Sequence, residues 1–141
     1  MRVLGLLACL LCSASLATAQ SSPPRARFPL AGSVWIVEEI DGRPVQVFGG
    51  LPPRLTFGAR GLAELRACNR YGISVDSAGA SSLRFRTLTS TLLTCGKGDA
   101  EDRALEQALL ATTTYVTEGG FLELGDDHGQ RRLRARRADQ P

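Results

Sequence analysis

From residue 34 onward the chain consists of short apolar stretches separated by turns, and this pattern constrains the fold more than any other feature. The stretches cover residues 34–40, 45–48, 54–57, 62–68, 73–76, 83–88, 115–117, 121–124 and 131–135. Several of them alternate apolar and polar residues, as strands with one buried face do. Segments rich in glycine, such as 58–61, separate them and favour hairpin turns. The pattern therefore predicts a sheet of mostly antiparallel strands.

One segment has a helical period instead. The residues that recur there at steps of three and four are Leu105, Ala108, Leu109, Thr112 and Val116. Asp99 is suited to cap the start of a helix, and Glu101 and Asp102 favour the positive end of its dipole. We therefore expect one amphipathic helix over about 100–113. Strands, one helix and further strands predict an α+β single domain, in which a mostly antiparallel, curved, half-barrel-like sheet packs on that helix.

The first nineteen residues have the pattern of a secretory signal peptide. Arg2 precedes an apolar run over 3–16, and Ala17-Thr18-Ala19 supplies the small residues that a signal peptidase requires. The run is shorter than the roughly 20 residues of a membrane-spanning helix. We expect cleavage after Ala19 and a periplasmic or secreted mature protein.

A lipoprotein is the less favoured interpretation of the same segment. Cys9 comes too early for a full apolar region, and Leu11 before Cys12 is too large for a lipobox. After cleavage, residues 20–29, which are rich in Pro and Ser, predict a disordered lead-in. The domain is then expected over 30–137, followed by a short tail at 138–141.

Removal of the signal peptide leaves two cysteines, Cys68 and Cys95. An even pair in an exported chain is most simply a disulfide. The alternative, a pair of metal ligands, lacks further ligands. The single histidine, His128, lies in a sequence typical of a turn, and no C-x-x-C is present. We therefore expect a disulfide, no metal site and no cofactor.

Three sequence elements together resemble one family. They are Trp35 with 40–42 (Ile-Asp-Gly), 68–71 (Cys-Asn-Arg-Tyr), and 91–95 (Thr-Leu-Leu-Thr-Cys) ahead of the acidic helix. With the closing strand pattern at 122–124 and Leu133, the chain resembles the META domain, the HslJ-like family of small bacterial envelope proteins, over about residues 30–136. Methionine is common in that family where this chain has Leu92 and Leu93.

The resemblance implies a scaffold and a setting, but no reaction. Members of the family are associated with heat and antibiotic stress in bacteria, and one protozoan relative with secretion and virulence. The family fold resembles that of a lipid-binding pilot protein of a secretion system. No catalytic residues are established for the family, so the resemblance implies no active-site residue in this chain.

The string Cys68-Asn69-Arg70-Tyr71 has two interpretations. In the structural one, which we favour, Asn69 bonds neighbouring amides after a strand, and Arg70 and Tyr71 pack beside the disulfide. In the other, Asn69, Arg70 and Tyr71 form a recognition lip at the edge of the sheet. Arg70 would then hold a carboxylate or a phosphate in bidentate fashion.

Five arginines lie between residues 131 and 137. A strand there would place Leu133 and Ala135 inward and Arg132, Arg134 and Arg136 outward. We expect this charge to protect an edge strand from aggregation. The alternative is a peripheral contact of the three outward arginines with an anionic membrane surface, either lipid or lipopolysaccharide.

Nothing in the sequence predicts an enzyme. The hydroxyl-rich segment 87–94 lacks a neighbouring base, because His128 is remote and Lys97 is the single lysine. Glu38 and Glu39 are expected on opposite faces of a strand, which makes them a poor acid–base pair. The net charge of +3 is too small to indicate nucleic acid, and an exported chain without interleaved aromatics makes that partner unexpected.

We therefore expect a non-catalytic, monomeric envelope protein. It would bind a partner protein, a peptide or an amphipathic, lipid-like ligand with its curved sheet, in stress or antibiotic tolerance. The alternative is a small secreted inhibitor that blocks a hydrolase with a rigid loop. The segment 48–53, with two glycines and two prolines, would suit such a protrusion.

Overall fold

The computed structural model describes residues 28–138. The expected signal peptide (1–19), most of the expected lead-in (20–27) and the end of the tail (139–141) lie outside the described residues. The elements in chain order are β1 (Val34–Ile40), β2 (Arg43–Pro44), β3 (Arg54–Phe57), β4 (Leu62–Arg66), β5 (Arg70–Asp76), β6 (Arg84–Ser90), η1 (Gly96–Gly98), α1 (Asp99–Leu110), β7 (Thr114–Glu118), β8 (Phe121–Gly125) and β9 (Arg131–Arg137). No helix among the described residues is long and apolar enough to cross a membrane.

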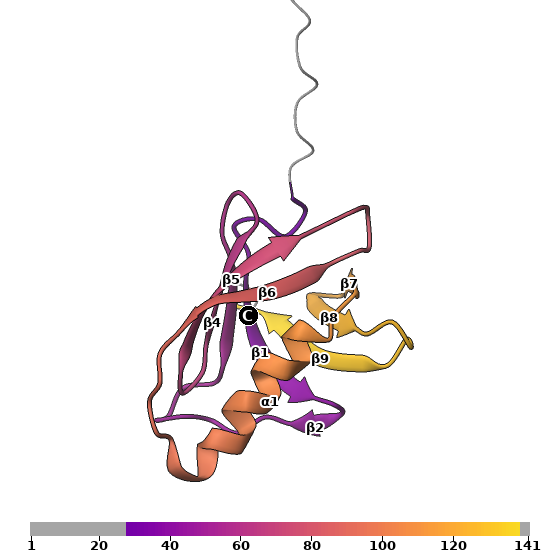
Figure 1. Cartoon of the computed structure of the whole chain (residues 1–141). Helices are drawn as coiled ribbons and strands as arrows, with labels where there is room; N and C mark the ends of the chain where they lie inside the picture. The colour runs from indigo at the N-terminus through magenta and orange to yellow at the C-terminus, as the bar shows by residue number, and fades with distance from the viewer. Residues whose placement is uncertain (1–27, 139–141) are drawn as a thin grey trace, which may run out of the picture.

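The strands form one antiparallel sheet in the order β6-β5-β4-β3-β1-β9-β8-β7, with β2 paired to β1 (Figure 1). The sheet curls until its two edges touch at one point, where Ser82 and Thr114 form an isolated bridge. The Leu83 amide donates to the Thr113 carbonyl at 3.0 Å beside it. The helix α1 lies across the open side of the curl (Figure 1). This is the expected half-barrel packed on one helix.

The core lies between the concave face of the sheet and α1. Alternation along the strands turns one apolar face inward, and the helix contributes Leu105, Ala108 and Leu109. The largest fully buried apolar side chains are Phe57, Leu55, Leu65, Leu83, Leu105, Leu109, Leu122, Leu124, Leu133 and Val37. Because these side chains pack into one continuous cluster, the interior is filled by the protein's own residues.

The segment that follows β2 differs from the prediction. The strand expected at 45–48 is absent, because Asp41 and Gly42 form a tight turn with positive φ and β2 pairs with β1 directly after it. The chain then turns again at Gly49 and Gly50, which also have positive φ. Phe48 and Leu51 pair across this second turn, so the segment 45–48 has room for only one bridge.

The helix begins and ends earlier than expected. A short 3-10 turn, η1, precedes it, so Asp99 is the first helical residue and not its cap. Its carboxylate instead accepts a hydrogen bond from the Cys95 amide at 2.6 Å. At the other end the Thr112 hydroxyl donates to the Ala108 carbonyl at 2.9 Å, and the β-branched residues that follow leave the helix and enter β7.

Phe28, which the sequence predicts in the disordered lead-in, packs against the core. The Phe28 ring lies 5.7 Å from the Phe57 ring between centroids, and Leu30 is buried. The prediction of disorder rests on local composition, because Pro and Ser dominate the preceding residues. The ring that Phe28 contacts lies 29 positions further along the chain.

β9 is not an edge strand, so the expected role of its arginines in edge protection is wrong. It lies between β1 and β8 in the interior of the sheet order, while β6 and β7 are at the edges. The alternation itself is confirmed, because Leu133 and Ala135 are buried and the arginines that alternate with them face outward. A row of arginines in an interior strand is stable only if neighbouring strands supply carboxylates.

Gly61→Ala is expected to lower the free energy of unfolding by about 3 kcal/mol. Gly61 has φ +70°, and an added Cβ would lie 2.7 Å from the Val75 carbonyl oxygen. Gly129→Ala is the matched control, since its φ is +76° but its Cβ would meet nothing within 4 Å. In that control the free energy of unfolding should fall only by the cost of a left-handed backbone, about 1–2 kcal/mol. Urea unfolding of both variants measures the difference, and equal losses would contradict the close approach.

Candidate functional site

The predicted disulfide between Cys68 and Cys95 is present, with the two Cα atoms 6.2 Å apart. It connects the turn between β4 and β5 to the segment that leads into η1. Gly98 in η1 in turn lies against Phe48, since a Cβ on Gly98 would approach the Phe48 ring to 2.5 Å. Three segments, 45–53, 66–70 and 91–98, therefore meet at one end of the sheet, which we name the disulfide end.

Asn69 holds this end together from the inside. Its side-chain oxygen accepts hydrogen bonds from the Thr91 hydroxyl at 2.9 Å and the Leu93 amide at 2.8 Å. Its side-chain nitrogen donates to Asp102 at 2.7 Å and to the Leu93 carbonyl at 3.4 Å. All four hydrogen-bonding positions of the amide are used, and asparagine offers two donors and two acceptors on one short side chain. Asn69 therefore fixes the loop that carries Leu93.

Asp102 of α1 is the buried partner of this network and is 2% exposed. Its carboxylate accepts hydrogen bonds from the Asn69 amide at 3.0 Å, from the Asn69 side chain at 2.7 Å and from the Tyr71 hydroxyl at 2.6 Å. A buried carboxylate is tolerated when donors surround it. The helix is thus tied to the start of β5 by three hydrogen bonds that span more than thirty residues of sequence.

Tyr71 stays protonated in the folded protein over an extended pH range. Burial raises the pKa of its hydroxyl, and the hydrogen bond to Asp102 and the charge of that carboxylate raise it further. In the unfolded chain the tyrosine would ionise near its ordinary pKa of 10.0. The folded state therefore binds more protons than the unfolded state above that pH, and stability falls as the pH rises.

Tyr71→Phe is expected to flatten this alkaline loss of stability. At neutral pH the variant loses the hydrogen bond to a charged group, about 1.5–3 kcal/mol. Above pH ~10 the wild-type protein should lose stability that the variant never had, so the two curves converge. Urea unfolding from neutral pH upward measures both. Parallel curves across this range would contradict the assignment.

Of the alternative recognition lip, only Arg70 faces solvent. Asn69 and Tyr71 are buried, whereas the Arg70 side chain is 57% exposed and 3.8 Å from Glu64. Asn69 and Tyr71 form hydrogen bonds beside the disulfide, as the structural interpretation describes. The binding role considered for the string can therefore apply to Arg70 alone.

The disulfide end presents apolar side chains that sequence reasoning missed. Leu92 is 94% exposed and Leu93 61%, and in the neighbouring segment Leu51 is 70% and Val47 57% exposed. A signal for the first pair was present, because Leu92 and Leu93 lie outside every strand or helix period in the sequence. Between the segment 48–53 and the outer face of β3 and β4 lies an open hollow of about 270 Å³, which Phe48 and Leu51 line.

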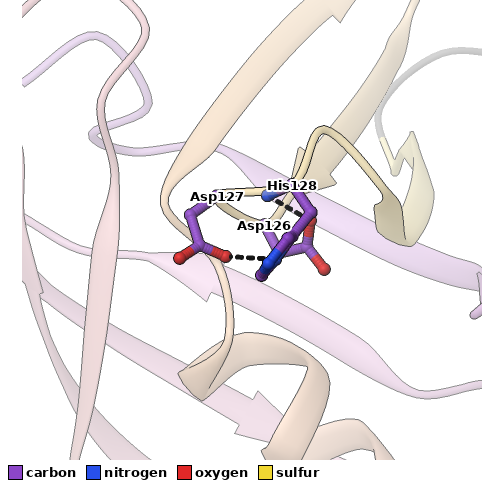
Figure 2. Close-up of side chains that lie close together, drawn as sticks. All are labelled: Asp126, Asp127 and His128. Atoms are coloured by element: carbon purple, nitrogen blue, oxygen red, sulfur yellow. Dashed lines mark hydrogen bonds and ion pairs between the residues drawn. The ribbon is translucent and has the colours of Figure 1, made fainter.

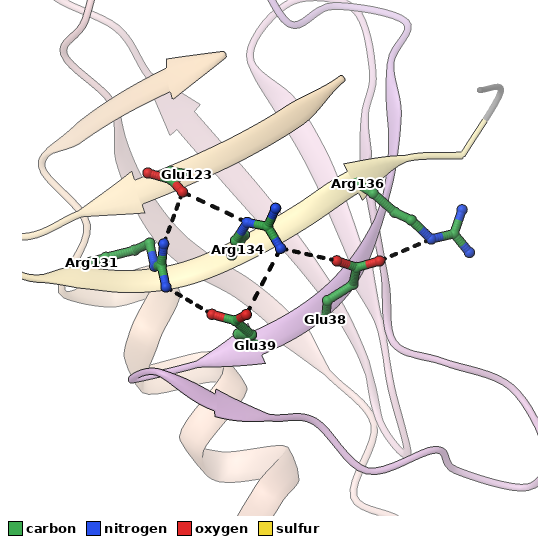
Figure 3. A network of polar contacts seen from close by, with 6 residues as sticks. All are labelled: Glu38, Glu39, Glu123, Arg131, Arg134 and Arg136. Carbon is green, nitrogen blue, oxygen red and sulfur yellow. Dashed lines mark hydrogen bonds and ion pairs between the residues drawn. The ribbon is translucent and has the colours of Figure 1, made fainter. Parts of the chain in front are cut away.

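The arginines of β9 are paired with carboxylates on the outer face of the sheet (Figure 3). Arg134 lies 3.4 Å from Glu38 and 3.8 Å from Glu39, and Arg136 lies 3.0 Å from Glu38. Arg131 completes the network, at 2.8 Å from Glu39 and 2.9 Å from Glu123. These charges stabilise one another within the sheet, where like charges in neighbouring strands would repel.

A bulge in β1 makes this pairing possible and corrects a prediction. The register between β1 and β9 shifts between Val37 and Glu39, so Glu38 is an extra residue. Glu38 and Glu39 therefore both point toward the arginines of β9 and not to opposite faces (Figure 3).

Arg132 is also paired, at 2.7 Å from Asp41 and 3.5 Å from Asp126. Each of Arg132, Arg134 and Arg136 thus has a carboxylate partner. The charges on this face balance, which removes the local excess of positive charge that motivates the alternative anionic contact. That contact stays a prediction, and it would now require the ion pairs to open.

The turn at Asp126, Asp127 and His128 brings three potential metal ligands within 4.8 Å of one another (Figure 2). The Asp126 carboxylate already accepts hydrogen bonds from the Gln130 amide at 2.9 Å and the His128 amide at 3.0 Å. These backbone bonds, with the Gln130 amide contributing most, hold the pKa of Asp126 below its ordinary value. Asp127 and His128 pair with each other at 2.7 Å. These contacts stabilise the turn between β8 and β9.

Hydroxyls of the segment 87–94 form hydrogen bonds within the fold. Thr87 donates to Glu106 at 2.9 Å, and Thr91 donates to Asn69 while it accepts from the Arg70 amide at 3.0 Å. These bonds connect β6 to the helix and to the start of β5. The segment therefore contributes to the rigidity of the disulfide end.

The chain is similar to known proteins in its sequence and in its fold. The family model of the META domain matches residues 28–139. A DUF4847 family protein from Bacteroides vulgatus superposes with a TM-score of 0.60 at 14% identity, covering 80% of this chain and 97% of that one. The NMR structure of a protein from Burkholderia xenovorans has a TM-score of 0.60 at 23% identity, covering 89% of this chain and 99% of that one.

A second NMR structure has a TM-score of 0.58 at 18% identity and covers 78% of this chain and 92% of that one. These structural likenesses show the fold. No curated protein matches the chain. Since the family model spans the described domain from Phe28 onward, the chain belongs to the META domain family.

Proposed function

We propose that this protein is an exported, non-catalytic binding module that contacts its partner through the disulfide end. The observation that carries the proposal is the exposure of Leu92, at 94%, on a loop whose neighbours are fixed by a disulfide and by Asn69. A leucine so exposed loses favourable burial in water and gains it at an interface.

Rigidity supports a binding role for this surface. The loop 91–95 is fixed at Thr91, at Leu93 and at Cys95, so little conformational freedom remains to be lost on association. Association with a preorganised surface is stronger because fewer side chains and backbone segments must be ordered. The nearby segment 48–53 is fixed in the same way by the pairing of Phe48 with Leu51.

Two features support export. The expected signal peptide ends at Ala19, and the disulfide is typical of oxidising compartments. The test is the amino-terminal residue and the location of the protein in the cell that produces it. We expect a mature chain that begins at Gln20 and lies outside the cytoplasm. A cytosolic protein that retains residues 1–19 would contradict export.

A photoreactive residue at position 92 tests the binding surface. Leu92→p-benzoylphenylalanine, introduced in the producing cell, should give discrete cross-linked products. Leu110→p-benzoylphenylalanine is the matched control, because Leu110 is also exposed, at 47%, but lies at the far end of α1. Mass spectrometry identifies the products. Equal labelling from both positions, or none from position 92, would contradict the proposal.

A second candidate, inhibition of a hydrolase, is favoured by the segment 48–53 alone. It turns tightly at two glycines of positive φ and presents Leu51 at 70% exposure. Such a protrusion fits a cleft. Inhibition of one enzyme in a panel of peptidases and lysozymes, lost in Leu51→Ser but kept in Leu92→Ser, would favour this candidate over the first. We propose that either function serves stress or antibiotic tolerance, as the resemblance to the HslJ-like family implies.

A further inference from the structure

Three arginines lie side by side across neighbouring strands on the outer face of the sheet. Arg54 of β3 is the register partner of Arg66 of β4, and Arg66 is the partner of Arg70 of β5. All three are exposed; Arg66 and Arg70 belong to the disulfide end, and Arg54 directly follows its segment 45–53. Directly opposed like charges destabilise an antiparallel pair, so this row has a cost to the fold.

Neutralisation of the row is incomplete. Among residues 28–138, one carboxylate pairs with this row. It belongs to Glu64, which lies 3.3 Å from Arg66 and 3.8 Å from Arg70. Arg54 has no carboxylate partner in that described range. The row therefore has an excess of two positive charges. The arginines of β9 provide the contrast, because there each outward arginine has a carboxylate at short distance.

Exposed apolar side chains stand at both ends of the row. On the Arg54 side, the segment 45–53 presents Val47 and Leu51. On the Arg70 side, the Thr91 amide donates to the Arg70 carbonyl at 3.1 Å, and Leu92 and Leu93 follow immediately. Cations next to protruding apolar side chains are the combination that binds the interface of an anionic bilayer.

We propose that the disulfide end docks on an anionic phospholipid surface, with Arg54, Arg66 and Arg70 on the lipid phosphates and Leu51 and Leu92 in the acyl boundary. Each guanidinium group can bind two phosphate oxygens at once, and a row of such groups can contact several neighbouring head groups. This inference rests on the proposed function, because it names the partner of the same surface. The apolar side chains project from separate loops, which suits a fluid surface into which each inserts independently.

Vesicle co-sedimentation of the purified, oxidised protein tests the inference. The probes are vesicles of pure phosphatidylcholine and vesicles of an equimolar mixture of phosphatidylglycerol and phosphatidylcholine. Preferential binding to the mixture is expected, weakening as salt is added. The triple variant Arg54→Gln, Arg66→Gln, Arg70→Gln should bind the mixture roughly 100-fold more weakly.

A matched control separates this site from net charge. Arg60→Gln, Arg84→Gln, Arg86→Gln removes the same three charges from exposed positions away from the disulfide end. That variant should keep most of its binding. Leu51→Ser with Leu92→Ser should weaken binding to both kinds of vesicle, with Leu110→Ser as its control. Circular dichroism and urea unfolding confirm that each variant is folded before it is compared.

Three results would overturn the lipid inference: no preference for phosphatidylglycerol, equal loss in the two arginine triples, or binding that is insensitive to the leucine pair. The proposed function fails on different evidence. If vesicles are not bound but the photoreactive residue at position 92 labels a protein, the lipid partner is wrong and the binding surface is right. If neither vesicles nor cellular components react with this end, both proposals are contradicted.

Discussion

Reduction of the Cys68–Cys95 bond should lower the free energy of unfolding by about 3.6 kcal/mol. The two cysteines are 27 positions apart, so the bond closes a loop of about 28 residues and restricts the unfolded chain. The loss is large against the roughly 5–15 kcal/mol of a typical domain. The bond also holds the segment 91–98 against the turn between β4 and β5, so its loss should release Leu92 from its fixed position.

Urea unfolding with and without a reductant measures this effect. The double variant Cys68→Ser, Cys95→Ser should match the reduced protein and should not respond to the reductant. Hydrogen exchange at the Leu93 amide, which donates to Asn69, should become faster in both cases. An unchanged midpoint on reduction, or a double variant as stable as the oxidised protein, would contradict the role of the bond.

Asp102→Ala is expected to cost about 4 kcal/mol, because it leaves three buried donors without an acceptor. The Asn69 amide, the Asn69 side chain and the Tyr71 hydroxyl all donate to this carboxylate. Asp102→Asn should cost less, because one oxygen remains and can still accept from one of the donors. The helix would also lose its hydrogen-bonded connection to the start of β5.

The matched control is Asp76→Ala. Asp76 is also paired, at 2.7 Å from Arg86, but both side chains are largely exposed, so its loss should cost about 0–1 kcal/mol. A double-mutant cycle of Asp102→Ala with Tyr71→Phe should show coupling of about 1–3 kcal/mol, since the two side chains share one hydrogen bond. Additive losses would mean that the carboxylate does not act through Tyr71.

Local patterns were sufficient for most of the elements. Apolar stretches bounded by turn residues predicted β1 at 34–40 and β3 at 54–57, where the structure has them. The period of α1 was visible because its buried face recurs along one stretch of chain. The disulfide followed from counting the cysteines that remain once the expected signal peptide is removed. These features depend on residues close in sequence or on composition, so the sequence contains their cause directly.

The functional reading of single residues depended on distant partners. Asp102 has the sequence character of an acid in the first turn of a helix, and the sequence does not show that Asn69 and Tyr71 surround it. Likewise Glu38 and Glu39 share a face because of one bulge in β1. A bulge depends on the pairing of β1 with β9, which are about a hundred residues apart.

Sheet order is the property that local sequence left open, and it changed the interpretation of the arginines in β9 and in β3 to β5. Alternation showed which side chains of 131–137 face outward, but only the placement of β9 between β1 and β8 made its arginines paired and balanced. The register of β3, β4 and β5 in turn brought Arg54, Arg66 and Arg70 into one row. The side-chain period of a strand is a property of its own backbone, whereas its neighbours are selected by the packing of the whole core.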